Sequence, residues 1–380
     1  MFDYLQGAIL PDKRGIHAVL SGSFESVGLS IDDAGIDSRH DLKVLGLPRA
    51  KRVCVVLVDG LGSEQLIARR GHARNLRNLN IDNFITSVIP ATTAAGITSF
   101  GTGKLPGQTS MAGYALKSPV NDRVFSLISW NDTIHDPQEW QREPTLFELL
   151  GERTRETVLI QPAKFIGSGL TLAALRGVRA LSAESLSDRV EAAVSELRSG
   201  TKMCYLYWGN LDSIGHKHGW ESEQWINELE LFDSEFGVLL RRLPPDTLVV
   251  LTADHGMIDA GAKIDIASSP ELRQDIDVVA GEERAFQIYT RDGDGVATRW
   301  RDAVGDHAWV LTKEEVISHG LLGPVNDLTK TAIGDVIVFS KDSTGFVDSR
   351  VHSTSAINMV GVHGSLTPAE MHIPLIVEVV

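Results

Sequence analysis

The sequence is poor in cysteine and in long apolar runs. Only two cysteines occur among 380 residues, Cys54 and Cys204, and both lie in apolar segments. A disulfide framework is therefore excluded, and a reducing compartment is compatible. No apolar run reaches the roughly 18 residues of a membrane span, and the N-terminal segment lacks the charged and apolar regions of a signal peptide. We expect a soluble, cytoplasmic protein without a membrane partner.

Basic residues are also scarce relative to acidic ones. The chain has 36 Lys and Arg against 50 Asp and Glu, a formal net charge of −14. General nucleic-acid binding is not expected, because it depends on cations that displace condensed counterions. The negative field would also repel an anionic substrate unless bound metal ions reverse it locally. Nothing in the sequence indicates an oligomeric state.

What the sequence contains is a series of short apolar segments that alternate with amphipathic ones. Apolar residues near helical spacing predict helices over Ser187–Leu197 and Trp225–Leu240. Near-continuous apolar strands are typical of a mostly parallel sheet covered by helices on both faces. The predicted fold class is therefore α/β, with functional groups just beyond the carboxyl ends of strands. The expected strands are Val53–Val58, Val124–Ser129, Thr157–Gln161, Met203–Trp208, Thr247–Thr252 and Pro374–Val379.

The alternation of apolar and amphipathic segments divides the chain into three regions. Residues 1–50 contain a Gly/Ser-rich patch and are expected to form an irregular N-terminal extension. Residues 51–259 and 351–380 form the predicted catalytic core. Between them, the alternation is lost, and isolated strand runs occur at Arg284–Thr290 and Asp335–Ser340. We interpret residues 260–350 as a small inserted α+β subdomain.

Carboxylates and imidazoles follow three of the apolar strands, and one more imidazole precedes the last. Each motif has a structural alternative, such as a strand-end turn or a helical Asp–His pair. Mixed oxygen and nitrogen donors suit zinc, with manganese or iron as alternatives. Six side chains exceed what one tetrahedral ion needs, so two ions roughly 3.5–4 Å apart are the economical interpretation. The candidate ligands are Asp59, Asp212, His216, Asp254, His255 and His363.

A hydroxyl-rich segment can supply a nucleophile. Thr92 can cap a helix that begins near Thr93 and ends before Gly101. A hydroxyl at a helix N-terminus lies where free N–H groups and the helix dipole favour an anion. Metal coordination would lower the pKa of the hydroxyl and activate it. A plain Thr-Thr cap is the structural alternative.

The order of these motifs resembles the alkaline phosphatase superfamily, with the nucleotide pyrophosphatase/phosphodiesterase branch as the most similar group. The motifs are Asp-Gly after the first strand, Pro-x-x-Thr with a later Thr-Gly, Asp-x-x-x-His, Asp-His-Gly-Met and a late His-Gly. The resemblance implies an α/β/α sandwich, two zinc ions and a covalent phospho-threonine intermediate. The nucleophile it implies is Thr93, three residues after Pro90 and nine before Thr102. It implies one zinc among Asp59, Thr93, Asp254 and His255, and another held by Asp212, His216 and His363.

One position departs from the diesterase pattern. That branch usually has an asparagine three residues after the nucleophile, where this chain has Gly96. The N–H of Ala94, or a side chain such as Asn131, is a possible replacement donor to a phosphoryl oxygen. A threonine nucleophile argues against sulfatases, and the lack of an arginine near Thr93 lowers the expectation of a monoesterase.

The predicted function is metal-dependent hydrolysis of a small-molecule phosphorus ester. Zinc-bound Thr93 would attack in line, with phosphodiesters or pyrophosphates as the favoured substrates. A phosphomonoesterase, phosphonate hydrolase or phosphomutase on the same two-metal frame is the first alternative. A non-catalytic metal-binding protein is the second.

Overall fold

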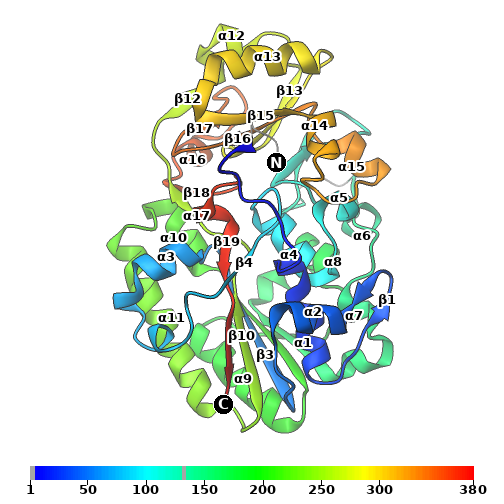
Figure 1. Ribbon diagram of the computed structural model, residues 1–380, viewed down its shortest axis with the longest axis vertical. Helices are drawn as coiled ribbons and strands as arrows, with labels where there is room; N and C mark the ends of the chain where they lie inside the picture. Colours follow the sequence, from blue (N-terminus) through cyan, green and yellow to red (C-terminus); the bar gives the residue numbers. More distant parts are fainter. Residues whose placement is uncertain (1–4, 131–133) are drawn as a thin grey trace.

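A six-stranded sheet forms the centre of the protein (Figure 1). The computed structural model describes residues 5–130 and 134–380. All neighbouring strands of this sheet are parallel except β20, which is antiparallel to β10. The predicted mostly parallel sheet is therefore confirmed. In spatial order its strands are β20 (Ile376–Val379), β10 (Thr247–Thr252), β3 (Arg52–Val58), β9 (Met203–Trp208), β7 (Thr157–Gln161) and β8 (Ala180–Ser182).

The inner strands are buried on both faces, which explains their continuous apolar sequences. Cys54 of β3 lies opposite Cys204 of β9, and both are fully buried. Helices cover the two sides of the sheet, α9 (Leu186–Ser199) and α11 (Glu223–Arg242) on one and α1 (Val19–Ser26) on the other (Figure 1). The predicted α/β/α sandwich is confirmed. None of the helices in the described residues has the length and apolar character that a bilayer crossing needs.

Two expected strands differ from the structure. Val124–Ser129 forms only the short β6 (Val124–Ser126), which pairs with β5 (Ala115–Lys117) outside the central sheet. Its Val124 is exposed, so this segment is not the two-sided buried strand that was expected. The expected strand Pro374–Val379 is divided, because Pro374 ends β19 (His372–Pro374), paired with β4 (Phe84–Thr86), before β20 begins. Proline has no N–H with which to continue a ladder.

The expectation of an irregular N-terminal region is wrong. The Gly/Ser-rich patch lies in α1, which packs against α2 (Ser38–Leu45), and Phe24 is fully buried in the main core. Small residues allow this close packing, since a Cβ on Gly22 would lie 3.1 Å from the Leu42 nitrogen. Sequence composition indicated a loop, but the small side chains form a helix–helix contact.

A second sheet lies at the end of the molecule opposite the C-terminus (Figure 1). All its neighbouring strands are antiparallel, and Phe286 and Trp300 belong to a core cluster of its own. The expected strand runs in residues 260–350 correspond to β14 and β16. The domain boundaries themselves stay a prediction. In spatial order the strands are β13 (Val278–Glu282), β14 (Ala285–Tyr289), β16 (Val336–Ser340) and β15 (Ala308–Thr312).

Substitution of Gly101 tests the packing of α4 (Thr93–Thr102), the helix that carries Thr93. A Cβ on Gly101 would lie 1.9 Å from the Ala174 carbonyl oxygen at the end of α8 (Gly169–Ala174). Gly101→Ala should therefore lower the free energy of unfolding by roughly 1–3 kcal/mol, against the helix propensity of alanine. Chemical denaturation measures the change.

Gly71→Ala is the matched control, because a Cβ there meets nothing within 4 Å. Its free energy of unfolding should stay within about 0.5 kcal/mol of wild type. Equal stabilities for the two variants would contradict the packing described.

Candidate active site

The predicted site residues gather at the carboxyl edge of three adjacent parallel strands. Asp59 follows β3, and Asp254 and His255 follow β10. Asp212 and His216 lie one turn apart on α10 (Asn210–His218), which begins just after β9. The carboxyl ends of parallel strands meet at one edge of a sheet, so side chains far apart in the sequence converge there.

The turn after β3 needs a glycine. Gly60 has a φ of 72°, and its N–H donates to Asp254 Oδ1 over 3.2 Å. A Cβ at this position would lie 3.0 Å from both Cα and Cβ of Asp212. The left-handed backbone and the close approach of α10 both favour glycine. Gly60 thus brings the loops that carry three of the carboxylates into contact.

Three imidazoles are oriented in the same way. The Nδ1 atoms of His216, His255 and His363 lie 2.8, 2.9 and 2.9 Å from the backbone carbonyl oxygens of Gly361, Gly256 and Ala91. With Nδ1–H donating to a carbonyl, Nε2 is the nitrogen of each ring that a metal ion would bind. Carbonyl partners of this kind fix metal-ligating histidines in metalloproteins. The rings of His255 and His363 are stacked, with centroids 3.6 Å apart.

Three buried carboxylate oxygens have no hydrogen-bond partner among the described residues. They are Asp59 Oδ1, Asp212 Oδ1 and Asp254 Oδ2. Each belongs to a side chain that is at most about one-seventh exposed. Buried polar atoms nearly always have partners, so orphaned ones require an explanation. Together with the imidazole Nε2 atoms, they form the mixed donor set that divalent cations such as zinc bind.

The donor atoms form two overlapping groups. Asp212, His216 and His363 form one, Asp59, Asp212 and His255 form the other, and the ligand atoms of each lie within 4.8 Å of one another. Asp212 belongs to both groups. Asp254 lies beside the second, with its Oδ2 3.6 Å from His255 Nε2. The structure thus brings all six predicted side chains together. The first group matches one implied set, whereas the second contains Asp212 where the resemblance implied Asp254, so the division of the ligands between two ions stays a prediction.

The ionised forms of the carboxylates at the carboxyl edge of the central sheet are unfavourable unless positive charge is added. Burial raises the pKa of Asp59 well above its usual range, and the charges of Asp254 and Asp212 raise it further. Burial also raises the pKa of Asp254. Burial opposes the charge of Asp212, but His216 holds the pKa of Asp212 below its usual value. Asp212 in turn outweighs burial and raises the pKa of His216 to about 9.

Thr93 lies next to the second donor group. Its Oγ1 is 3.1 Å from His255 Nε2, at the first residue of α4. The helix runs through Gly101 to Thr102 and ends at Gly103 (φ 69°), so the expected end before Gly101 is wrong. Thr92 occupies the cap position, but its side chain does not cap the helix. The first amides of α4 therefore face the site without side-chain caps.

The two predicted donors to a phosphoryl oxygen have different outcomes. Ala94 is the second residue of α4, where a backbone N–H has no partner inside the helix, and its role stays a prediction. Asn131 lies outside the described residues. Gly96 is explained by packing, because a Cβ there would lie 2.9 Å from Asp254 Cβ and 3.0 Å from the Asp254 carbonyl oxygen.

Tyr207 is a site residue that the sequence reasoning missed. Its hydroxyl donates to Asp59 Oδ2 over 2.6 Å, and this bond opposes the rise in the pKa of Asp59. Tyr205 and Tyr207 alternate on β9, so they share one face of the strand. Both line the cleft beside Thr93. Two alternating tyrosines on the strand that precedes Asp212 are the sequence signal that could have identified Tyr207 as a site residue.

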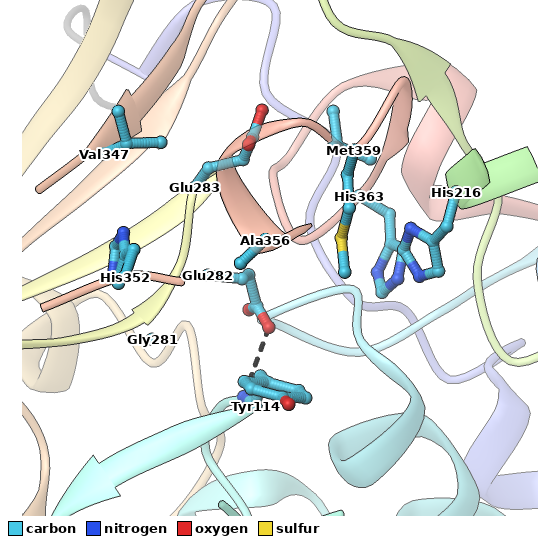
Figure 2. A pocket seen from close by; sticks show the side chains of 11 residues that line it. Tyr114, His216, Gly281, Glu282, Glu283, Val347, His352, Ala356, Met359 and His363 are labelled. Carbon is cyan, nitrogen blue, oxygen red and sulfur yellow. Dashed lines mark hydrogen bonds between the residues drawn. The ribbon is translucent and has the colours of Figure 1, made fainter. Parts of the chain in front are cut away.

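Two hollows adjoin the donor groups. A cleft of about 570 Å³ lies over Thr93 and Asp59. A smaller hollow of about 160 Å³ extends from His216 and His363 towards the second sheet (Figure 2). There, Glu282 Oε2 accepts a hydrogen bond from the Tyr114 N–H over 3.2 Å, and burial raises the pKa of Glu282 to about 8.

Two solved structures illustrate the proteins that share this fold. Murine ectonucleotide pyrophosphatase/phosphodiesterase 5 is similar with a TM-score of 0.65 and 17% identity, over 86% of this chain and 88% of that one. Phosphonoacetate hydrolase from Sinorhizobium meliloti 1021 is similar with a TM-score of 0.68 and 19% identity, over 91% and 92% of the chains. No curated protein matches the sequence significantly.

The family is shown by the sequence itself. Residues 53–366, well over half of the chain, match the model of a hydrolase family described as type I phosphodiesterase / nucleotide pyrophosphatase. This match confirms the resemblance inferred from the order of motifs, and it disfavours a non-catalytic binding protein. The chain belongs to the type I phosphodiesterase / nucleotide pyrophosphatase family.

Proposed function

We propose that the protein is a two-metal phosphodiesterase or pyrophosphatase with Thr93 as its nucleophile. The observation that carries this proposal is the position of the Thr93 hydroxyl, 3.1 Å from His255 Nε2, beside three orphaned carboxylate oxygens. Zinc is the favoured metal because of the mixed donors, and manganese or iron is the alternative. One ion would be held by Asp59, Thr93, Asp254 and His255, and the other by Asp212, His216 and His363.

Bound ions would neutralise the carboxylates, lower the pKa of the attacking hydroxyl and stabilise charge on the departing oxygen. Thr93 Oγ1 would lose its proton to water and form a bond to phosphorus, while the bond from phosphorus to the leaving oxygen breaks on the opposite side and that oxygen takes up a proton from water. Water then cleaves the phospho-threonine, which releases the second product and restores the hydroxyl. Free amides in the first turn of α4 lie where they can bind phosphoryl oxygens.

The family supports a diester or pyrophosphate substrate. The murine relative has also been solved as an inactive threonine-to-alanine variant in complex with AMP, which in that protein links activity to a threonine. In this chain, the cleft of about 570 Å³ over Thr93 has room for a substrate of nucleotide size. Tyr207 and Phe165 offer aromatic surface along it, with ring centroids 5.9 Å apart.

Hydrolysis of a phosphonate with a second anionic group is the alternative function. Lys164 is the one lysine or arginine among the described residues that line the cleft, and it is exposed. Its ammonium group would suit a carboxylate or second phosphate on the substrate. The similar phosphonoacetate hydrolase was solved in complex with phosphonoacetate. Relative rates on a nitrophenyl phosphodiester and on phosphonoacetate distinguish the two functions.

Replacement of Thr93 tests the nucleophile. Thr93→Ala should lower kcat by about 10³-fold or more, because the variant lacks the hydroxyl that would form the covalent intermediate. Thr92→Ala, its neighbour in the same segment, should retain turnover and the phosphorylated enzyme. Initial rates on a nitrophenyl phosphodiester and the mass of acid-quenched protein report both. A Thr93→Ala enzyme with parental activity would exclude Thr93.

Removal of the metal should abolish turnover, and zinc should restore it. Zinc should also raise the free energy of unfolding, because the ligands converge only in the folded chain. A single site at 100 times its Kd contributes about 2.7 kcal/mol. Thermal and chemical denaturation of chelated and zinc-loaded protein measure this difference.

Asp212→Asn should lose most of that stabilisation, since Asp212 belongs to both donor groups. Asp302→Asn, an exposed position on α13 (Gly293–Val304), is the control and should keep it. Zinc that stabilises both variants equally would contradict the assignment of the ligands.

Replacing Gly96 by the asparagine that is usual in the diesterase branch should lower kcat. Gly96→Asn places a Cβ 2.9 Å from Asp254 Cβ, so α4 must move and carry Thr93 with it. We expect kcat to fall at least about 10-fold, since misplacement of a reacting group by 1 Å can cost 10²-fold. Gly96→Ala should show a similar loss, because the clash begins at Cβ. A rise in diesterase activity of Gly96→Asn would show that space for the side chain exists.

A further inference from the structure

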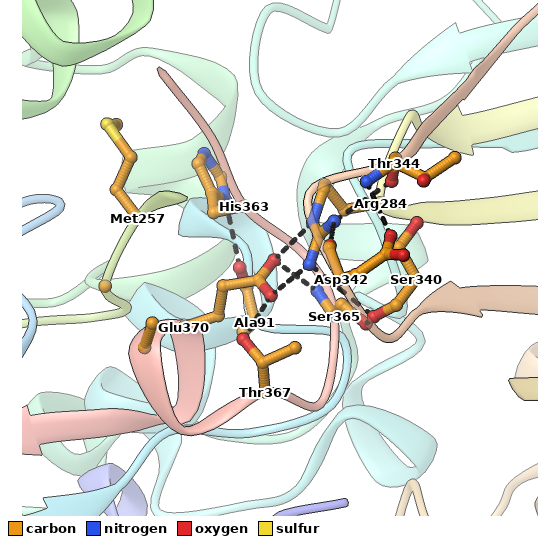
Figure 3. A network of polar contacts seen from close by, with 12 residues as sticks. Ala91, Met257, Arg284, Ser340, Asp342, Thr344, His363, Ser365, Thr367 and Glu370 are labelled. Atoms are coloured by element: carbon orange, nitrogen blue, oxygen red, sulfur yellow. Dashed lines mark hydrogen bonds and ion pairs between the residues drawn. The ribbon is translucent and has the colours of Figure 1, made fainter. Parts of the chain in front are cut away.

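A buried ion pair joins the second sheet to the loop that carries His363. Arg284 Nε and Nη2 donate to the two carboxylate oxygens of Glu370 over 3.0 and 2.7 Å (Figure 3). Both side chains are 0% exposed. The residues are 86 positions apart in the sequence, and each comes from a different part of the fold. Two parallel charge-assisted bonds fix the relative orientation of the two segments.

At the second sheet, Arg284 donates hydrogen bonds to the backbone of neighbouring turns. It lies between β13 and β14, directly after Glu283. Nη1 donates to the carbonyl oxygens of Thr344, over 3.0 Å, and of Asp342. The same β13–β14 turn follows Glu282, which lines the hollow next to the donor groups. Arg284 therefore ties this wall of the hollow to the rest of the subdomain.

Glu370 accepts hydrogen bonds from the segments that carry the candidate ligands. It lies in α17 (Pro368–Met371) and accepts bonds from the Ser365 N–H over 3.0 Å and the Thr367 hydroxyl over 2.6 Å. Its backbone carbonyl accepts from the N–H of Gly256, next to His255, over 2.8 Å. Ser365 in turn is two residues after His363. One carboxylate residue thus holds the backbone beside both histidines.

The same loop also reaches the nucleophile segment. The Gly364 carbonyl accepts from the Ala91 N–H over 3.1 Å, and His363 Nδ1 lies 2.9 Å from the Ala91 carbonyl oxygen (Figure 3). Ala91 is two residues before Thr93. A displacement of residues 363–371 would therefore move His363 and the start of α4 together.

Stability alone is a poor explanation for such a pair. Burial of two charges costs solvation that their attraction often only matches, and apolar replacement of both partners is frequently neutral for folding. What an apolar pair cannot supply is the directional, bidentate geometry. The pair therefore fixes the orientation of the two segments that it joins relative to each other.

We propose that Arg284 and Glu370 are positioning residues for His255 and His363, and through Ala91 for Thr93. The inference rests on the proposed metal-dependent function. Neither residue is one of the candidate ligands; the pair fixes the backbone beside the ligands and links it to the turn that lines the smaller hollow.

The test separates orientation from stability with a double variant. Arg284→Met with Glu370→Met replaces both charges by flexible apolar side chains of similar length. We expect the metal-free double variant to fold with a lower melting temperature, because the backbone groups of Asp342, Thr344 and Ser365 lose hydrogen-bond partners. Its zinc affinity should fall by about 10- to 100-fold, as for other groups that orient metal ligands. At saturating zinc, kcat should fall more than 10-fold, with KM changed less than about threefold.

Two further variants keep the test decisive. Arg284→Lys retains the charge but loses the bidentate fork, so it should fold and still show the fall in kcat. Cobalt(II) bound to it should show altered visible absorption, which reports ligand geometry. Arg179→Met with Glu196→Met is the control, a more exposed bidentate pair outside the site with bonds of 3.2 and 2.6 Å. It should leave zinc affinity and kcat unchanged.

The outcomes distinguish the two proposals. Wild-type zinc affinity, kcat and cobalt spectrum in both Arg284 variants would overturn the positioning role and leave the proposed function intact. A wild-type protein that binds no divalent ion and hydrolyses no phosphorus ester would overturn both. A double variant that binds zinc more weakly only in proportion to a lost melting temperature would show that the pair is purely structural.

Discussion

Three buried carboxylates at one edge of the sheet set the constraint on which the rest of the structure depends. Asp59, Asp212 and Asp254 come from segments that follow adjacent parallel strands, and each leaves one oxygen without a partner among the described residues. Burial disfavours the charge of each, and repulsion from neighbouring carboxylates adds to this at Asp59 and Asp254. Only at Asp212, among these three, is burial outweighed, because His216 holds the pKa of that carboxyl below its usual value. Divalent cations would balance the remaining charge, and they would also let an acidic protein accept an anionic substrate.

The surrounding fold brings these groups together by close backbone approach. Gly60 lets α10 approach the turn after β3, and Gly96 lets α4 approach Asp254. Carbonyl oxygens fix all three imidazoles, so the orientation of the ligands depends on segments that carry none of the chemistry. The second sheet contributes through Arg284, which links it to the loop of His363. Site geometry is thus a property of both sheets.

Local sequence patterns predicted the sheet and the donor set but not the contacts that orient them. Continuous burial explains why β7, β9 and β10 have the bounds expected from their apolar runs. The strand-end rule predicted where the candidate ligands gather, because the carboxyl ends of parallel strands meet at one edge of the sheet. The N-terminal helices were missed because small residues in a packed helix resemble those of a loop. Arg284 and Glu370 are invisible to any local pattern, since only the tertiary fold makes them neighbours.

Anomalous diffraction from crystals grown with zinc tests the central claim most directly. The account predicts two peaks per chain, roughly 3.5–4 Å apart. One should be bonded to Asp212, His216 and His363, and the other should lie among Asp59, Asp254, His255 and Thr93 Oγ1. Crystals of active enzyme without a peak at this edge of the sheet, or with zinc bound only elsewhere, would contradict it.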